Sequence, residues 1–150
     1  RARPTAAVHW QTACCSARIT ATPSTELAEM SDPASPVKLN GGVVLKFNAS
    51  QKYTTNGVTG AVFHSLCDVS KVPVQEYYNR PDLPGGSTLG NLLGAQVSVP
   101  MADIGLPQLA MHSCVELTGA KDAQWLADAC AAWFRAEIRC TGDGCYQVAL

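Results

Sequence analysis

The sequence predicts an α/β layer architecture, and three observations carry that prediction. A β-branched apolar run at residues 42–48 (GVVLKFN) is typical of a strand. At residues 57–72 the apolar positions then recur at steps of three and four, which is the spacing of a helix. A second short apolar run follows at residues 74–78. Strands that alternate with helices in this way pack as layers of sheet and helix.

Turn and capping residues set the expected boundaries in the first half of this pattern. Asn40-Gly41-Gly42 is a turn signal just before the first strand. Thr54 or Thr55 is expected to cap the helix, because a threonine hydroxyl can accept from the first free N–H groups. Pro73 is expected to end it.

The second half continues with shorter elements. Past the turn-rich sequence NRPDLPGG, Ser87 or Thr88 is expected to cap a short helix at residues 89–93. A third extended segment is expected within residues 96–104. Asp122 is expected to cap a final helix, whose apolar face is formed by Trp125, Leu126, Ala129, Ala132 and Trp133.

Composition limits the classes of function. Hydrophobic residues make up 47% of the 150 residues and charged residues 15%, a low share that is typical of a piece of a larger assembly. The net charge of −1, without a Lys/Arg cluster, argues against nucleic-acid binding. No apolar run approaches the roughly 20 residues of a membrane span, so we expect no membrane partner and a cytoplasmic protein.

The seven cysteines form no CxxC pair and no Cys/His ladder, so they indicate free thiols in a reducing compartment rather than a structural zinc site. Three zones of the sequence differ in composition and in the periodicity of their apolar residues. Residues 1–25 have no consistent period and fit neither helix nor strand, residues 26–134 have the pattern of folded protein, and residues 135–150 begin as a helix continuation and become Gly/Cys-rich.

Three stretches carry a family resemblance: GVVLKFNASQKYTTNG, NRPDLPGGSTLG and DIGLPQLAMHSCVE. Together they resemble the C-terminal part of the aspartyl aminopeptidase and aminopeptidase I family, closest to its bacterial members. The resemblance implies a three-layer αβα fold, of which this chain would be the incomplete C-terminal half of a di-zinc catalytic domain. It further implies two zinc ions, a peptide substrate with an N-terminal residue that is possibly acidic, and a homo-oligomeric intact enzyme.

The resemblance assigns roles to six residues. His112 corresponds to a histidine that ligates one zinc ion, and neutral imidazole is a suitable zinc donor. Lys46 and Tyr53 match positions that line the substrate pocket, where the lysine could pair with an acidic side chain and the tyrosine could hydrogen-bond an oxyanion. Gly86, Ser87 and Thr88 match a substrate-facing loop. Without the resemblance, these would be a loop histidine, an edge-strand lysine, a half-buried tyrosine and a helix cap.

Other acidic groups have weaker claims. Asp82 and Asp103 are carboxylates near the motifs, but the family pattern does not make them ligands. Glu116 could assist the site indirectly, by supporting a metal ligand rather than by binding the metal itself. The general base and most other ligands are expected upstream of the portion present here, so no catalytic residue is assigned within this chain.

The segment before Glu26 departs from the family. A family segment that reads like Ser-Ala-Asp-Asn-Gly-His-Ala-Val-His-Pro should stand there, and the chain has CSARITATPST instead. When residues 9–25 are back-translated and read one frame over, the codons permit Ser-Ala-Asp-Asn-Gly-His-Ala-Val-His. We hypothesise an out-of-frame translation of the family motif; the alternative is a genuinely divergent N-terminal tail.

Three interpretations of the whole chain stay open at this point. The first is a fragment of a zinc-dependent aminopeptidase, a hydrolase that removes N-terminal residues. The second is a catalytically inactive globular fragment with no activity of its own, because one imidazole cannot fix a zinc ion. The third is a secreted module stapled by a disulfide between Cys140 and Cys145, which would require export to an oxidising compartment.

Overall fold

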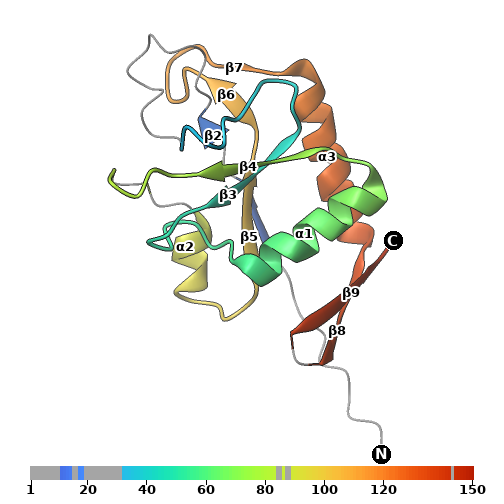
Figure 1. Ribbon diagram of the computed structural model, residues 1–150. Coiled ribbons are helices and arrows are strands. Elements are labelled where there is room, and N and C mark those ends of the chain that lie inside the picture. The colour runs from blue at the N-terminus through green and yellow to red at the C-terminus, as the bar shows by residue number, and fades with distance from the viewer. Residues whose placement is uncertain (1–10, 15–16, 19–31, 84–85, 87–88, 143) are drawn as a thin grey trace, which may run out of the picture.

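The computed structural model describes residues 11–14, 17–18, 32–83, 86, 89–142 and 144–150 (Figure 1). Its centre is a four-stranded sheet with the strand order β1-β5-β3-β4. The strands are β1 (Gln11–Cys14), β3 (Val43–Phe47), β4 (Val74–Tyr78) and β5 (Met101–Gly105). β3 is parallel to β4 and β1 is parallel to β5, whereas β3 and β5 are antiparallel. The sheet is therefore mixed, and the prediction of an α/β fold is confirmed.

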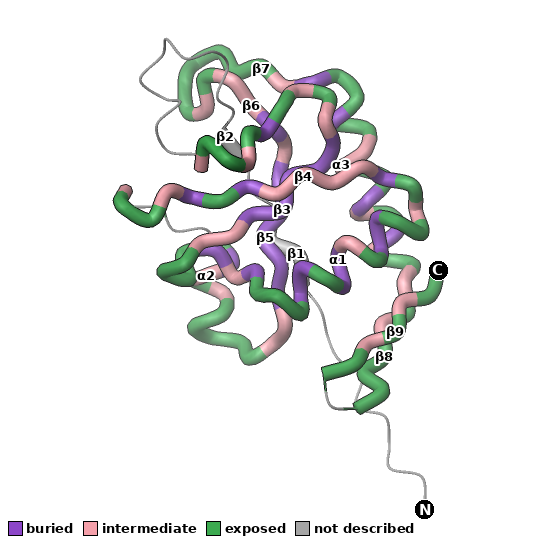
Figure 2. The backbone as a smooth tube through the Cα atoms, in the orientation of Figure 1, coloured by how far each residue is buried: buried purple, intermediate pink, exposed green. Residues whose placement is uncertain are grey.

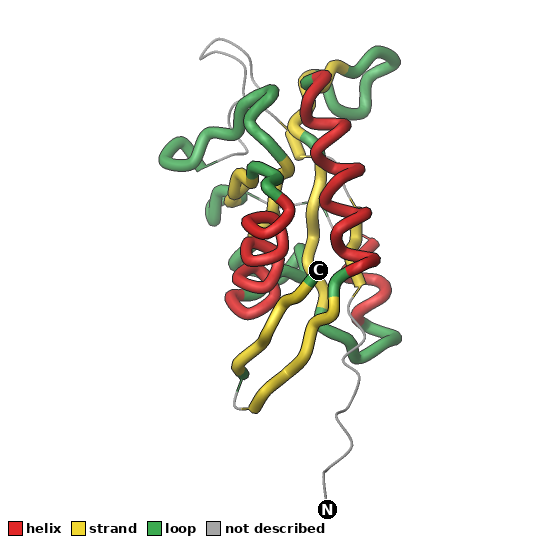
Figure 3. Tube along the Cα trace, turned by 90° about the vertical axis from the view of Figure 1, so that its right-hand side faces the viewer, coloured by secondary structure: helices red, strands yellow, loops and turns green. Residues whose placement is uncertain are grey.

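Helices cover both faces of this sheet. The helices are α1 (Gly57–Ser70), α2 (Leu89–Gly94) and α3 (Ala120–Arg135). α1 and α3 pack on one face, where Leu45 and Ile104 lie in a cluster with Phe63 of α1 and Ala132 of α3. α2 lies on the other face, because a Cβ at Gly94 would meet Met101 and Thr54. Figures 2 and 3 show the buried strands enclosed between these layers.

The alternation of side chains along β3 decides what each face carries. Val43, Leu45 and Phe47 point to the helix-covered cluster, whereas Val44 packs on the opposite face with a second cluster. All but Phe47 of the five strand residues are buried. Because both faces of β3 are buried, its sequence is a nearly continuous apolar run, and this run is the pattern that predicted the strand.

The start of α1 differs from the expectation. The N-cap is Asn56, whose side chain accepts from the N–H groups of Val58 and Thr59 in a capping box. Capping by Thr54 or Thr55 is therefore wrong, because both threonine hydroxyls bond to Asp103 instead. The helix ends at Ser70, and Lys71 takes the left-handed conformation two residues before Pro73.

The start of α3 also differs from the expectation. Its N-cap is Gly119, which makes no side-chain cap, so the prediction that Asp122 caps this helix is wrong. The Asp122 carboxylate instead accepts from the backbone N–H groups of Asn40 (2.6 Å) and Gly42 (3.0 Å). It is fully buried and therefore ties the turn before β3 to the first turn of α3.

A small second sheet lies beyond the end of β5. It has the order β2-β6-β7, from β2 (Ala17–Arg18), β6 (Pro107–Leu109) and β7 (Leu117–Thr118). β2 is parallel to β6, and β6 is antiparallel to β7. The expectation of no regular structure in residues 1–25 therefore does not hold for Gln11–Cys14 and Ala17–Arg18. Their strands form against distant partners, which local periodicity does not reveal.

The chain ends in a hairpin of β8 (Glu137–Gly142) and β9 (Cys145–Ala149). Figure 1 shows it at the opposite end of the molecule from β6 and β7. Cys140 pairs with Tyr146, so Cys140 and Cys145 occupy successive cross-strand positions that face opposite sides of the hairpin. Both thiols are free and exposed, so the structure does not contain the staple between them.

Candidate functional site

The face of the sheet opposite α1 and α3 carries the predicted substrate-side residues. Lys46 belongs to this face because it alternates with Leu45 and Phe47 along β3. Its side chain is almost entirely buried, at 4% exposure, and its Nζ lies 4.3 Å from the centroid of the Tyr53 ring. A lysine ammonium over an aromatic face is a favourable cation–π contact. Lys46 is therefore no edge-strand lysine in water.

Tyr53 packs beside a second tyrosine that the sequence had not marked. The rings of Tyr53 and Tyr77 meet edge to face, with centroids 6.3 Å apart, and Val44 packs with both. The Tyr77 hydroxyl donates to Asn79 Oδ1 at 2.9 Å, at the start of the NRPDLPGG sequence. Tyr77 thus connects the Lys46–Tyr53 pair to that loop. Its strand register could have revealed it, since Tyr77 pairs directly with Lys46.

Asp103 holds the segment that carries Tyr53. The carboxylate is fully buried on β5, and its Oδ2 accepts from Thr54 N (2.7 Å) and from Thr54 Oγ1 (3.1 Å). The hydroxyl of Thr55 accepts from the Asp103 backbone N–H at 2.8 Å. Because Thr54 follows Tyr53 directly, this anchor fixes where the tyrosine ring stands. Asp103 was considered in the sequence only as a possible metal ligand, and its role as an anchor was missed.

His112 lies in the loop between β6 and β7. Its side chain is exposed, and its backbone has a φ of 73°, in the left-handed region that few non-glycine residues adopt. The His112 N–H donates to Glu116 Oε1 at 2.5 Å. At the base of this loop, Leu109 packs against the cluster that contains Tyr53 and Tyr77. The His112 loop and the Lys46–Tyr53 pair therefore share one packed support.

The remaining predicted site residues are less closely integrated. Gly86 is exposed, and Ser87 and Thr88 lie outside the described residues, as does the predicted cap of α2. Asp82 is engaged by Arg80, whose guanidinium donates to both carboxylate oxygens, and this lowers the pKa of Asp82. Because Arg80 occupies both oxygens of this exposed carboxylate, Asp82 stabilises the loop through an ion pair, and we do not expect it to bind a metal.

The donor groups of the described residues fall short of what a zinc ion needs. A catalytic zinc requires three protein ligands and an open position. Within the described ranges, no three His, Cys, Asp or Glu side chains converge as such a site demands. Asp103 and Asp122 are committed to backbone N–H groups. The described residues therefore do not form a zinc centre, and His112 can supply at most one ligand of it.

Comparison with known proteins gives the family. A family model described as "Aminopeptidase I zinc metalloprotease (M18)" matches residues 3–134. The Probable M18 family aminopeptidase 2 of Mycobacterium tuberculosis H37Rv is 43% identical over 107 residues, which are 71% of this chain and 25% of that protein. The protein of the same name from Pseudomonas aeruginosa UCBPP-PA14 is 46% identical over 96 residues, or 64% of this chain and 22% of that protein.

Solved structures agree on the fold. A cryo-EM structure of Ape4 with Nbr1 matches with a TM-score of 0.73 at 31% identity, covering 83% of this chain and 23% of that one. A crystal structure of prApe1 matches with a TM-score of 0.76 at 22% identity, covering 84% and 26%. The family model defines the class as the zinc metalloproteases. Within that class, this chain belongs to the M18 aminopeptidase family, and it spans about a quarter of the length of the curated relatives.

Proposed function

We propose that this chain is part of a zinc aminopeptidase that removes N-terminal residues, acidic ones included, from peptides. The observation that carries the proposal is the Lys46–Tyr53 pair, which lies on a common packed support with the His112 loop. Membership of the M18 family supports the peptidase class. Lys46 is assigned the acidic side chain of the substrate, and Tyr53 a hydrogen bond to its carbonyl oxygen.

His112 is proposed as a ligand of one of two zinc ions in the intact enzyme. Gly86, Ser87 and Thr88 are proposed to face the peptide. The described residues do not complete a metal site, so we propose that the 150-residue chain alone hydrolyses no peptide and binds zinc weakly. Every catalytic step is assigned to the intact enzyme, which supplies the further ligands and the general base.

The intact enzyme is further proposed to be a cytoplasmic homo-oligomer. A solved structure of the same fold is entitled "Structure of S. cerevesiae mApe1 dodecamer". No helix in the described part of this chain combines the length and apolar character needed to cross a bilayer.

The division of the chain into an out-of-frame segment (1–25), a catalytic-domain part (26–134) and a divergent tail (135–150) also stays a proposal. The described strands of the first segment nevertheless pair with the strands of the catalytic-domain part. Gln11 pairs with Met101 and Arg18 with Gln108, so β1 and β2 follow β5 and β6 with a single register. Sequencing the encoding DNA tests this proposal: if no single frame change near residue 25 restores the motif, the divergent-tail alternative stands.

Two measurements test the function. Zinc titration followed by NMR should shift the ring protons of His112 with weak affinity, and His64 serves as an internal reference because Glu76 already engages its Nε2 (2.9 Å). An aspartyl amide should shift the Lys46 signals more than an alanyl amide does, and Lys46→Met should abolish that difference. Zinc-dependent hydrolysis of either amide by the purified chain would refute the proposed inactivity. Equal shifts with both amides would refute the acidic preference.

A further inference from the structure

We propose that Glu116 is a positioning residue for His112, and that together with Gln108 it clamps the histidine backbone in its left-handed conformation. The role of the clamp rests on the proposed function of His112 as a zinc ligand. The clamp itself is a property of the loop at residues 110–116 and can be tested separately.

The loop is closed by pairing of its two ends. β6 and β7 are antiparallel, with Gln108 opposite Thr118 and Leu109 opposite Leu117. This pairing returns residue 116 to the start of the loop, beside the strand that carries Gln108. Glu116 can therefore reach the loop interior from its closing end, although four residues separate it from His112 in sequence.

Two contacts define the clamp. Glu116 Oε1 accepts from the His112 backbone N–H at 2.5 Å, and Glu116 Oε2 accepts from Gln108 Nε2 at 3.1 Å. Each carboxylate oxygen thus has its own donor, which fixes the plane of the carboxylate. A side chain held at both oxygens can in turn fix the amide of His112 and with it the direction of the histidine.

Two opposing effects act on the conformation of the loop. A left-handed backbone is unfavourable at a residue with a Cβ, and Ala110 in the same loop has a φ of 54° as well. A hydrogen bond to a charged group is stronger than one to a neutral group, although the exposure of Glu116 weakens it through solvent screening. The hydrogen bond therefore opposes the backbone cost, and its removal should release the loop.

The side-chain amide of Gln108 is oriented by its hydrogen bond to Glu116. A carboxylate has no donor, so the Gln108 amide must turn its nitrogen toward Glu116. Its Oε1 is then buried and has no hydrogen-bond partner among the described residues. Glu116 therefore sets the orientation of this amide, although that orientation leaves a buried acceptor unsatisfied, which is unfavourable.

This orphaned oxygen makes Glu116→Gln an informative variant. Its carboxamide oxygen can still accept from the His112 N–H, and its nitrogen can donate to Gln108 Oε1 once the Gln108 amide turns over. Glu116→Gln should therefore preserve the loop, whereas Glu116→Ala removes the acceptor altogether. Gln108→Leu removes only the support of the carboxylate and should have an intermediate effect.

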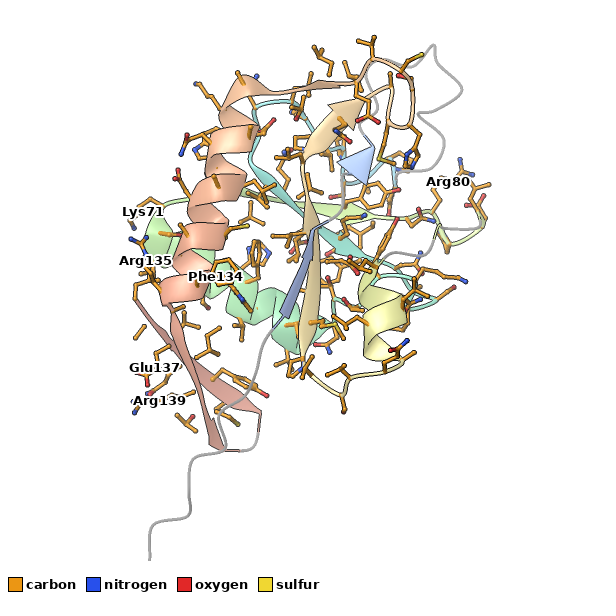
Figure 4. The ribbon with its side chains drawn as sticks, turned by 180° about the vertical axis from the view of Figure 1, so that it is seen from behind. Lys71, Arg80, Phe134, Arg135, Glu137 and Arg139 are labelled. Carbon is orange, nitrogen blue, oxygen red and sulfur yellow. The ribbon has the colours of Figure 1, made fainter. Side chains whose placement is uncertain are left out.

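The control comes from the hairpin. Glu137 accepts from Arg139 at 2.5 Å in an exposed ion pair, and Figure 4 shows both on the hairpin at the end of α3. Glu137→Ala removes an acidic side chain of the same type without touching the His112 loop.

The experiment measures exchange of the His112 amide proton with solvent by NMR in the full chain. In Glu116→Ala this proton should exchange about 10-fold to 100-fold faster, as expected for loss of a charge-assisted hydrogen bond. In Glu116→Gln and Glu137→Ala the rate should stay within about threefold of the unmodified chain. The amide of Ile104 in β5 should be unaffected in all variants, which separates local release from global unfolding.

An unchanged His112 exchange rate in Glu116→Ala would overturn the clamp. Acceleration of Ile104 by the same factor would also overturn it, because the effect would then be global destabilisation. Zinc titration distinguishes the proposed function: if zinc fails to shift the His112 ring in the unmodified chain, the metal role fails while the clamp stands. If zinc shifts the ring and Glu116→Ala weakens that shift while Glu116→Gln restores it, the positioning role is supported.

Discussion

Removal of the Asp103 carboxylate is the sharpest test of how this fold positions its candidate site. Asp103 is fully buried on β5, and its Oδ2 accepts from both the N–H and the hydroxyl of Thr54. The substitution Asp103→Ala leaves the Thr54 N–H without its acceptor. We expect the segment around Thr54 to detach from β5 and the Tyr53 ring to move away from Lys46.

The magnitude follows from the two lost contacts. An unsatisfied, partly buried N–H costs about 1–3 kcal/mol, and the lost hydroxyl bond adds about 0.5–1.5 kcal/mol. Relief of the burial of a charge offsets part of this. Asp103→Ala should therefore lower the free energy of unfolding by about 1–4 kcal/mol, a large share of the 5–15 kcal/mol typical of a domain. Asp103→Asn should lose only about 1 kcal/mol, because its carbonyl oxygen, in the place of Oδ2, can still accept from both the N–H and the hydroxyl of Thr54.

Urea unfolding gives the stability, and the NMR shifts of the Lys46 side chain give the position of the ring. In the native chain, Lys46 Nζ lies 4.3 Å from the Tyr53 ring centroid, so neighbouring protons should show a ring-current shift. Asp103→Ala should reduce that shift, and Asp103→Asn should retain it. Asp128→Ala is the matched control, since this exposed aspartate on α3 only accepts from Gln124 at 2.9 Å. A stability loss no greater than that of the control, or an unchanged ring-current shift, would refute the anchoring role.

Three further predictions concern other parts of the fold. The hydrogen bond to Glu76 raises the pKa of Tyr78 to about 12. Its stabilising effect is therefore complete below about pH 10, the ordinary tyrosine pKa, and is lost as the pH rises through 12. Ultraviolet titration of Tyr78→Phe should lack one tyrosinate step near pH 12, and an unchanged curve would refute this. Burial raises the pKa of Cys67 to about 12, so a thiol reagent should label exposed Cys114 in the folded chain and reach Cys67 only in denaturant, as mass spectrometry can map. Gly42 has a φ of 114° and a Cβ there would lie 2.2 Å from Pro73 O, so Gly42→Ala should cost about 2–4 kcal/mol in urea unfolding; Gly57→Ala, with nothing within 4 Å of its Cβ, is the control and should not destabilise the chain.

The parts of the fold that the sequence predicted are those whose cause is local. The strands at 43–47 and 74–78 have β-branched or aromatic runs between turn residues, and both were found at those positions. The helix predicted at 57–72 exists at Gly57–Ser70. A helix within residues 89–93 was also expected, and α2 occupies Leu89–Gly94.

The errors share one physical origin, which is competition from a distant partner. Thr54, Thr55 and Asn56 can all cap a helix, and the choice among them depends on Asp103, which lies almost fifty residues away. Asp122 has the right spacing for a cap, but the turn before β3 offers it two N–H groups. A local pattern identifies a hydrogen-bonding group without identifying the partner that it takes.

The same competition limits the candidate site. Lys46 and Tyr53 were marked by the resemblance, and the structure brings them together, although their roles in binding stay predictions. Tyr77 was missed because its importance comes from pairing with Lys46 across strands. His112 was marked by its motif, but the left-handed backbone and the Glu116 contact depend on closure of the β6–β7 loop.

The buried carboxylates limit what the described residues can contribute to the proposed site. Asp103 and Asp122 are both fully buried, and each has backbone N–H groups from another segment as its donors. Both carboxylates anchor loops, and releasing those loops would leave buried N–H groups unsatisfied at about 1–3 kcal/mol each. We therefore expect the acidic ligands of the proposed zinc centre to come from outside the described residues. The described part of the chain then contributes to that proposed centre a packed framework and one proposed donor, His112.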